Sequence, residues 1–274
     1  MPPPERVLAA FGLGGSAPRP LAGGQGRAWS AGHLVLKPAD DVAEVAWAGN
    51  ALSGLVEDGF RINRPLRAGT GDWVVDGWAA WTWLDGEQDT SGREAEILHV
   101  GERLNEALCG LARPAFLDDR THPWAIADRM AWDEEPMVLA HAALRPVAER
   151  LADLVRPEDG PSQVIHGDLT GNVLFAPGLA PGVIDFTPYW RPPRFCSAIV
   201  VVDGLLWHGA PPSLLDALAG SHRTSLLARA ALYRLIASDR LALQDAPPRS
   251  AHLRATVSDH ERVAGIIDRS AVPN

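Results

Sequence analysis

Three oxygen-bearing side chains, those of Asp168, Asn172 and Asp185, lie next to short apolar runs in the second half of the chain. The first two belong to the stretch VIHGDLTGNVLF and the third to VIDF. Phosphoryl transfer needs a carboxylate near the attacking hydroxyl group and separate oxygen ligands for Mg²⁺. The three side chains are therefore candidates for that chemistry. Taken alone, His166-Gly167-Asp168 is as typical of a turn that ends a strand.

Lys37 is the only lysine among 25 lysine and arginine residues. In such an arginine-rich chain, a retained lysine indicates a position where a compact ammonium group cannot be exchanged for a planar guanidinium. Lys37 ends a predicted strand over 33–37, which Pro38 closes. The alternative, an ordinary surface lysine, would predict further lysines elsewhere.

A glycine-rich turn precedes the lysine strand. Its residues Gly23, Gly24 and Gly26 would allow backbone N–H groups to approach anionic oxygens such as those of phosphates. The turn is not a Walker A loop, because no Gly-Lys-Ser or Gly-Lys-Thr sequence ends it.

The pattern of apolar residues changes along the chain and predicts an α+β protein. The first part reads as a small sheet-rich lobe, with a short helix over 7–11, strands over 33–37, 60–64, 73–76 and 77–84, and a helix over 42–56 capped by Asp40 or Asp41. From residue 94 the periodicity is mainly helical, over 97–111, 139–155, 197–207, 214–243 and 251–268, with strands near 164–165, 173–175 and 182–186. Asp85-Gly86 breaks the pattern, so we expect lobes over 1–85 and 86–274.

Composition restricts the class of protein. Hydrophobic residues make up 46% of the chain and charged residues 22%, which predicts a globular protein. The net charge of -9 argues against nucleic-acid binding, and no apolar run is long enough to cross a bilayer. The first residues lack the layout of a signal peptide, so we expect a cytoplasmic protein. Cys109 and Cys196 are expected to be buried free thiols, because they form no CxxC pair.

The segment 164–186 resembles the catalytic core of the aminoglycoside and choline phosphotransferase family, which consists of small-molecule kinases with a protein-kinase-like fold. The loop HGDLTGN is similar to the family's catalytic loop, and VIDF is similar to its magnesium motif. By order of elements the resemblance extends over 21–84. It implies a bilobal fold, in which a small antiparallel-sheet lobe binds the nucleotide and a larger, mainly helical lobe carries catalysis and substrate binding.

The resemblance also implies roles for individual residues. Asp168 would be the general base or would orient the acceptor hydroxyl, while Asn172 and Asp185 would hold Mg²⁺ on the phosphates of ATP or GTP. Lys37 would contact the α- and β-phosphates, with Glu44 on the following helix as its partner. His166 is expected to brace the loop rather than to carry a proton.

One departure from the family pattern follows VIDF. Cys196 or Ser197 stands where the family's G-D-P-x-x-D-L-A segment has its second aspartate, so neither the bracing of the loop nor the substrate class follows from the resemblance. The segment Tyr189-Trp190-Arg191 would then shape an unusual acceptor pocket. The acidic run 133–135 is either a solvated face, which we favour, or a patch for a cationic substrate.

Three functions are consistent with these residues. The leading hypothesis is a kinase that phosphorylates a hydroxyl of a small molecule, either an antibiotic-like compound or a metabolite. A non-catalytic nucleotide-binding protein with a kinase fold is the first alternative, although such proteins commonly lose one of the four residues Lys37, Asp168, Asn172 and Asp185. A kinase that acts on serine or threonine in peptides is the second.

Overall fold

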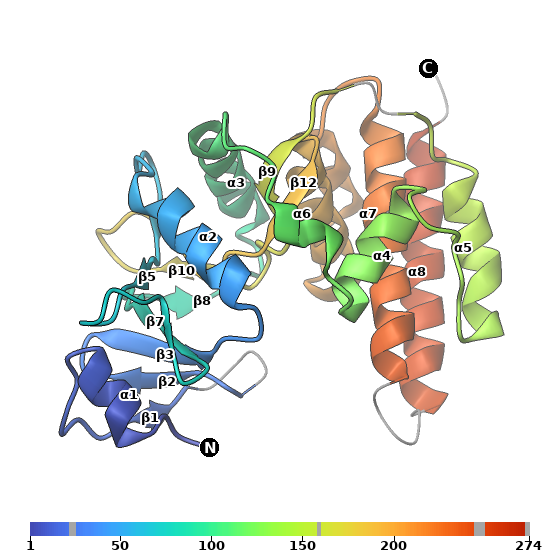
Figure 1. The fold of residues 1–274 in the computed structure, drawn as a ribbon. Coiled ribbons are helices and arrows are strands. Elements are labelled where there is room, and N and C mark those ends of the chain that lie inside the picture. The colour runs from blue at the N-terminus through green and yellow to red at the C-terminus, as the bar shows by residue number, and fades with distance from the viewer. Residues whose placement is uncertain (22–25, 158–159, 244–249, 272–274) are drawn as a thin grey trace. The chain divides into compact units, whose positions relative to one another are not determined.

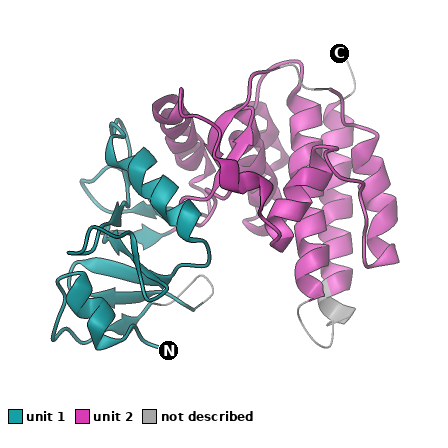
Figure 2. Cartoon of the chain, viewed as in Figure 1, with its two compact units in different colours: residues 1–88, 172–185 teal, residues 89–171, 186–274 magenta. Residues whose placement is uncertain are grey.

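The computed structural model describes residues 1–21, 26–157, 160–243 and 250–271. The chain forms two compact units, coloured separately in Figure 2. The first contains Met1–Gln88 and Asn172–Asp185, and the second contains Asp89–Gly171 and Phe186–Asn274. The segment 172–185 thus belongs to the first unit, whereas the expected division at residue 85 grouped it with the C-terminal part. The assignment of functions to 1–85 and 86–274 stays a prediction.

The first unit contains two sheets (Figure 1). The larger one has the order β1-β2-β3-β7-β5, with β6 also paired to β7, and all its pairs are antiparallel. The smaller one has the order β4-β11-β10-β8 and contains one parallel pair, β4 with β11. The strands are β1 (Arg19–Pro20), β2 (Trp29–Ala31), β3 (Leu34–Pro38), β4 (Arg61–Ile62), β5 (Pro65–Leu66), β6 (Val74–Val75), β7 (Trp78–Thr82), β8 (Glu87–Gln88), β10 (Val173–Phe175) and β11 (Gly182–Val183).

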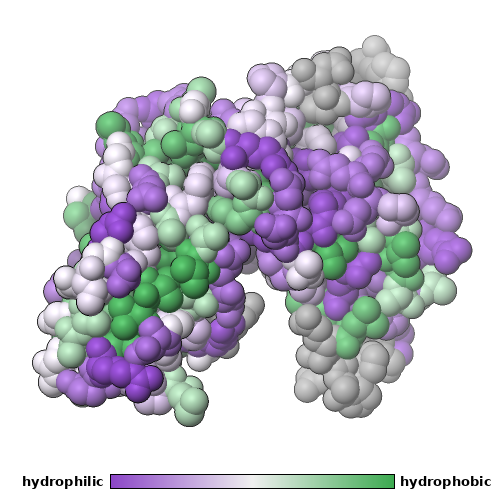
Figure 3. Space-filling view, viewed as in Figure 1, coloured by the Kyte–Doolittle hydropathy of each residue, from purple (hydrophilic) through white to green (hydrophobic). Residues whose placement is uncertain are grey.

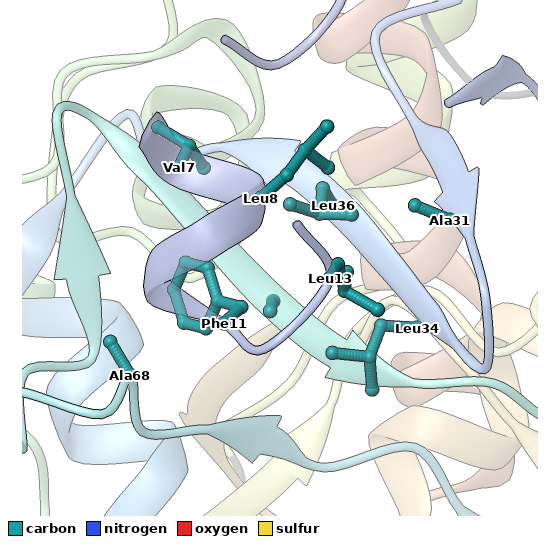
Figure 4. Packing of buried hydrophobic residues seen from close by; sticks show 9 residues of the cluster. Val7, Leu8, Phe11, Leu13, Ala31, Leu34, Leu36 and Ala68 are labelled. Atoms are coloured by element: carbon teal, nitrogen blue, oxygen red, sulfur yellow. The ribbon is translucent and has the colours of Figure 1, made fainter. Parts of the chain in front are cut away.

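Two helices accompany these sheets, α1 (Glu5–Ala10) and α2 (Val42–Ser53). The Asp41 side chain accepts from the N–H groups of Ala43 and Glu44 and so caps α2, as one of the two predicted caps. The apolar side chains of α1 and of the residues after it pack on the larger sheet, as Figure 4 shows for Val7, Leu8 and Leu36. On the face of the first unit seen in Figure 3, hydrophobic residues gather over the sheet.

The second unit is mainly helical. Its α-helices are α3 (Glu94–Leu108), α4 (Pro123–Ala131), α5 (Arg145–Ala152), α6 (Arg194–Trp207), α7 (Arg223–Ala242) and α8 (Ser250–Ser270). Three 3-10 helices, η1 (Ala115–Asp118), η2 (Ala142–Leu144) and η3 (Pro212–Ala217), and the strands β9 (Gln163–His166) and β12 (Pro188–Arg191) complete the described part. The central helix α7 packs against α4, α5, α6 and α8.

Two further expectations concern single residues and membrane helices. Cys196 is buried and Cys109 is exposed, so the expectation of two buried thiols was wrong for Cys109; both are free cysteines. Among the described residues, no helix combines the length and the apolar character needed to cross a membrane.

Candidate active site

Lys37 lies on β3, an interior strand of the larger sheet, where it is paired with Ala79 of β7. Its side chain is 25% exposed, and its Nζ forms an ion pair with the carboxylate Oδ1 of Asp185. The ammonium also lies 5.8 Å from the ring centroid of Trp81. Burial lowers the pKa of Lys37 to about 8, while the neighbouring carboxylate of Asp185 favours the charged form. The predicted pairing of Lys37 with Glu44 stays a prediction.

Asn172 and Asp185 lie at the two ends of the β10–β11 hairpin. The N–H of Ile184 donates to the carbonyl oxygen of Asn172 at 2.9 Å, which places Asp185 one residue beyond the strand position opposite Asn172. Asp185 has a φ of 52°, in the left-handed region that few non-glycine residues adopt. Such backbone strain is common at functional sites. The hairpin therefore brings the two predicted metal ligands to one end of the first unit.

The donor set of this hairpin end fits Mg²⁺. A carboxylate and an amide oxygen are ligands that Mg²⁺ accepts, and it commonly takes one or two protein ligands together with phosphate oxygens and water. Within the described ranges, no three His, Cys, Asp or Glu side chains gather as a metal-binding group. An Asn–Asp pair thus suits a metal that arrives with a nucleotide better than a permanent structural ion.

A pocket of about 230 Å³ opens beside Lys37 within the first unit. Apolar side chains from three parts of the unit line it, among them Val35, Leu174 and Ile184. Asn63 also lines the pocket and is 2% exposed, and its Oδ1 has no hydrogen-bond partner among the described residues. A buried acceptor without a partner is costly unless a ligand or water supplies a donor. Sequence reasoning missed Asn63, because it belongs to no motif.

The glycine-rich turn is only partly described. Gly26 has a φ of 66°, which glycine adopts without strain. Gly23 and Gly24, which we also predicted to approach phosphates, lie outside the described residues. Next to the turn, the guanidinium of Arg27 forms an ion pair with Asp40.

Asp168 belongs to the second unit, in the loop after β9. Its side chain is 44% exposed, and its Oδ1 accepts a hydrogen bond of 2.7 Å from the Nη2 of Arg234 on α7. The same guanidinium donates to both carboxylate oxygens of Asp203 on α6. Neither Arg234 nor Asp203 was predicted as a site residue, because both lie in helices outside the recognised motifs.

The loop around Asp168 is braced from within the second unit. His166 is fully buried, its Nδ1 accepts from the N–H of Asp168 at 3.1 Å, and its ring packs edge-on against Phe186. These contacts agree with the expectation that His166 braces the loop. Gly167 lies against the ring of Tyr189, so that a Cβ at this position would come within 2.2 Å of the ring.

Tyr189 and Arg191, which we expected to shape the acceptor pocket together with Trp190, are buried, and all three residues line a small pocket of about 80 Å³ in the second unit. The hydroxyl of Tyr189 lies 3.3 Å from that of Tyr233. The guanidinium of Arg191 forms ion pairs with Asp128 and with Glu134. Tyr189 and Arg191 therefore have partners within the second unit, and their contribution to an acceptor pocket stays a prediction.

The acidic run 133–135 is neutralised by arginines. Asp133 pairs with Arg229 and Glu135 pairs with Arg129, and Glu134 pairs with Arg191 as described above. The carboxylates are partly exposed, as the favoured solvated face requires, yet each has a cationic partner. The run is therefore a poor candidate for a patch that attracts a cationic substrate.

A larger cavity, of about 650 Å³, lies in the second unit against α3, α6 and the end of η3. Asn105, Gln163 and Ser197 contribute polar groups to it. None of the predicted site residues lines this cavity. Lys37 lines the smaller pocket of the first unit, and Asp168 belongs to the second unit.

Solved structures share this fold at low sequence identity. A spectinomycin phosphotransferase, APH(9)-Ia, in complex with ADP and spectinomycin is 13% identical, with 96% of each chain covered and a TM-score of 0.62. A thermostable mutant of the aminoglycoside phosphotransferase APH(4)-Ia is 16% identical over 98% of this chain and 100% of that chain, with a TM-score of 0.62. The choline kinase LicA from Streptococcus pneumoniae is 13% identical over 92% and 93%, with a TM-score of 0.53. These likenesses confirm the predicted α+β, protein-kinase-like fold.

The sequence itself decides the family. A search of curated proteins found no match. A family model described as the phosphotransferase enzyme family (APH) matches residues 6–189, which is more than half of the chain and includes all of the predicted site residues. The predicted resemblance and the predicted class of enzyme, a kinase with a hydroxyl acceptor, are thereby confirmed. The chain belongs to the phosphotransferase enzyme family.

Proposed function

We propose that the chain transfers the γ-phosphate of ATP or GTP to a hydroxyl group of a small antibiotic-like or metabolite molecule, with Lys37, Asn172, Asp185 and Asp168 as its working residues. The observation that carries this proposal is the ion pair of Lys37 with Asp185 beside the pocket of the first unit. It joins a cation suited to phosphates with a carboxylate suited to Mg²⁺. Complexes of relatives with ADP and spectinomycin support a nucleotide donor and a small-molecule acceptor.

In the first unit, Lys37 would bind the α- and β-phosphates through its ammonium group, with Glu44 as its expected second partner. The pocket lined by Val35, Leu174 and Ile184 would hold the adenine or guanine ring of the nucleotide. The backbone around Gly26 would approach the phosphates. Asn172 and Asp185 would hold Mg²⁺, which neutralises the developing negative charge on the phosphates when bound.

In the second unit, the carboxylate of Asp168 would accept a hydrogen bond from the acceptor hydroxyl and so orient its oxygen. As the bond from that oxygen to the γ-phosphorus forms, the bond from phosphorus to the bridging oxygen breaks, and the nucleoside diphosphate leaves with that electron pair. Asp168 receives the hydroxyl proton. Positioning and charge neutralisation dominate such a loose transition state, so a fixed carboxylate suffices.

The competing functions differ in what they require. A non-catalytic nucleotide-binding protein needs no fixed carboxylate at the position after His166-Gly167. In this protein the carboxylate of Asp168 is held there by the buried Arg234. A peptide kinase is less compatible with the antibiotic and choline kinases that share the fold. We further propose that the protein works in the cytoplasm, where nucleoside triphosphates and Mg²⁺ are supplied, and that it does not bind nucleic acids, given its net charge of -9.

The proposal is tested by measuring nucleotide consumption by the full chain, with Mg-ATP and Mg-GTP, against a panel of hydroxylated metabolites and antibiotics. We expect at least one acceptor to raise consumption, with phosphate recovered on that acceptor, and the Asp168→Asn variant to lose this stimulation. Binding of Mg-nucleotide without stimulation by any hydroxyl compound would favour the non-catalytic alternative. Phosphorylation of peptides alone would favour the peptide kinase.

A further inference from the structure

Arg234 forms the centre of a buried charge cluster in the second unit, together with Asp203 and Asp168. Its Nε and Nη2 donate to the Oδ1 and Oδ2 of Asp203 at 2.7 and 2.5 Å. The Nη2 also donates to the Oδ1 of Asp168 at 2.7 Å. One guanidinium therefore joins a carboxylate of α6 to the carboxylate of the candidate catalytic loop.

Exposure decreases in order along this cluster. The side chain of Asp168 is 44% exposed, whereas those of Arg234 and Asp203 are 2% and 1% exposed. The guanidinium thus contacts Asp168 from the protein interior and leaves the carboxylate accessible to solvent. This is the arrangement that a base needs, because the group that fixes it must not cover it.

The guanidinium is itself held in place. Its carbon lies 5.5 Å from the ring centroids of both Trp124 and Trp207 and 5.1 Å from that of Tyr233. Rings at these distances favour a cation and restrict its movement. Burial alone would oppose the charge of Arg234, but the carboxylates of Asp203 and Asp168 raise its pKa well above the ordinary value.

Asp203 explains why Arg234 can be buried. A buried cation is tolerated only when it is paired and its donors are satisfied. Asp203 accepts from two nitrogens of the Arg234 guanidinium. The contact to Asp168 is therefore not the only interaction that compensates for the burial of Arg234. Cys196 and Ser197 stand where the family pattern has an aspartate after VIDF. The Arg234–Asp203 pair contacts the Asp168 loop from other positions, on α7 and α6.

We infer that Arg234 is a positioning residue, which fixes the carboxylate of Asp168 for its contact with the acceptor hydroxyl, and that Asp203 fixes Arg234. This inference rests on the proposed function, in which Asp168 is the base. It predicts that Arg234 affects the chemical step through Asp168 and has little effect on nucleotide binding, which we assigned to residues of the first unit.

The test compares Arg234→Lys with Arg229→Lys in the full chain. Arg229 is a matched control, because it lies on the same helix, is also buried, stacks on Trp132 and pairs with Asp133, but has no contact with Asp168 among those the structure gives. We expect Arg234→Lys to lower kcat for nucleotide turnover by about 10- to 100-fold, the cost of a small misplacement of a catalytic group. The KM for nucleotide should change less than about twofold, and Arg229→Lys should keep a kcat close to that of the unaltered protein.

A double-mutant cycle separates positioning from general stability. If Arg234 acts through Asp168, then Arg234→Lys should lower kcat no further in the Asp168→Asn background. Equal losses of kcat in both backgrounds would overturn the inference. If Asp168→Asn alone left turnover intact, the proposed role of Asp168 would fail first, and that result is distinct from an unaffected Arg234→Lys beside an impaired Asp168→Asn.

Two further measurements cover variants that fold poorly or turn over too slowly. The Arg234→Gln/Asp203→Asn double variant removes both buried charges together, which is better tolerated than removing one; it should also show the lower kcat, and an unchanged kcat would overturn the inference. A crystal structure of Arg234→Lys should show the Asp168 carboxylate displaced or in several rotamers. A carboxylate in its original position would contradict the inference without any activity assay.

Discussion

Lys37 and Asp185 are 148 residues apart in sequence, and their side chains form an ion pair within the first unit. The pair joins the larger sheet, which carries Lys37 on β3, to the end of the β10–β11 hairpin, where Asp185 lies. A single ammonium group therefore contacts the carboxylate that we assign to Mg²⁺. Replacement of either residue should change how the protein binds a nucleotide and its metal, each in its own way.

The Lys37→Arg variant should bind Mg-nucleotide at least about tenfold more weakly, although it retains the positive charge. A guanidinium is planar and larger than an ammonium, and its donors point in fixed directions, so it cannot replace a compact cation beside Asp185. Isothermal titration calorimetry with Mg-ATP and Mg-GTP measures the change. Arg67→Lys, at an exposed arginine that stacks on Trp73, is the control. Unchanged affinity and turnover in Lys37→Arg would mean that the single lysine has no special role.

The Asp185→Asn variant should show its defect in the dependence on metal. An amide is a weaker ligand for Mg²⁺ than a carboxylate, so half-maximal turnover should require a higher Mg²⁺ concentration. The measurement is turnover as a function of Mg²⁺ concentration at saturating nucleotide. If the Mg²⁺ dependence matched that of the unaltered protein, Asp185 would not be a metal ligand.

The Asp168→Asn variant should differ from Asp185→Asn by keeping nucleotide affinity and metal dependence. Its turnover should fall by about a hundredfold or more, which is the scale of a lost general acid or base. Nucleotide affinity from calorimetry and kcat from steady-state kinetics separate the two effects. Full turnover in Asp168→Asn beside an impaired Asp185→Asn would show that the HGD loop holds no base.

Much of the first unit could be predicted, because its elements have local signals. The strand that carries Lys37 was expected over 33–37 and is observed as Leu34–Pro38. The helix after it was expected over 42–56 and ends earlier, at Ser53, where Gly54 follows. The strands β1, β2, β5 and β8 were not predicted. They are two or three residues long and too short to show an alternation of apolar and polar residues.

The contacts of the site could not be predicted from the motifs. Sequence spacing placed Asp168 and Asn172 in one loop but gave no information on Arg234, 66 residues further along. An arginine flanked by apolar residues within a helix, as Arg234 is, is a usable signal, since such a charge needs partners if its helix is buried. The helix α4 was also missed, although His122 and Pro123 mark its start. The pairing of β9 with β12, which buries Tyr189 and Arg191, depends on a register that the sequence does not specify locally.

The Asn63→Leu variant should affect stability and nucleotide affinity in opposite directions. In the unaltered protein, the Oδ1 of Asn63 is buried without a partner among the described residues. Replacement by an apolar side chain should therefore raise the free energy of unfolding by about 1 kcal/mol or more. If this oxygen accepts a hydrogen bond from the bound base, nucleotide affinity should fall. Thermal melts without nucleotide and calorimetry with ATP and GTP measure both.

Thr82→Val is the contrasting variant at the same pocket. The Oγ1 of Thr82 accepts a hydrogen bond of 2.9 Å from the N–H of Arg64, so its removal leaves a donor unsatisfied and should lower stability by about 1 kcal/mol. If Asn63→Leu lowered stability as Thr82→Val does, the amide of Asn63 would have a structural partner, and its assignment to the nucleotide would lose its basis.

The Gly167→Ala variant tests how closely the loop of Asp168 is packed. A Cβ at this position would lie 2.2 and 2.5 Å from two carbons of the Tyr189 ring, and Tyr189 is buried with its hydroxyl beside that of Tyr233. The ring therefore has little room to move, and the cost should be about 1–3 kcal/mol in the free energy of unfolding. Because the loop must shift, turnover should fall as well, through displacement of Asp168.

A control and a rescue separate this clash from a general effect of alanine. Gly54→Ala introduces the same methyl group at a helix end where no heavy atom lies within 4 Å, and it should change stability by less than about 0.5 kcal/mol. In a Tyr189→Leu background, which removes the ring, the cost of Gly167→Ala should shrink, because the two residues are in contact. Urea denaturation of the unaltered protein, the two single variants and the double variant gives the coupling energy between positions 167 and 189. If Gly167→Ala lowered the free energy of unfolding as much in the Tyr189→Leu background as in the unaltered protein, the backbone conformation, and not Tyr189, would require glycine in the HGD loop.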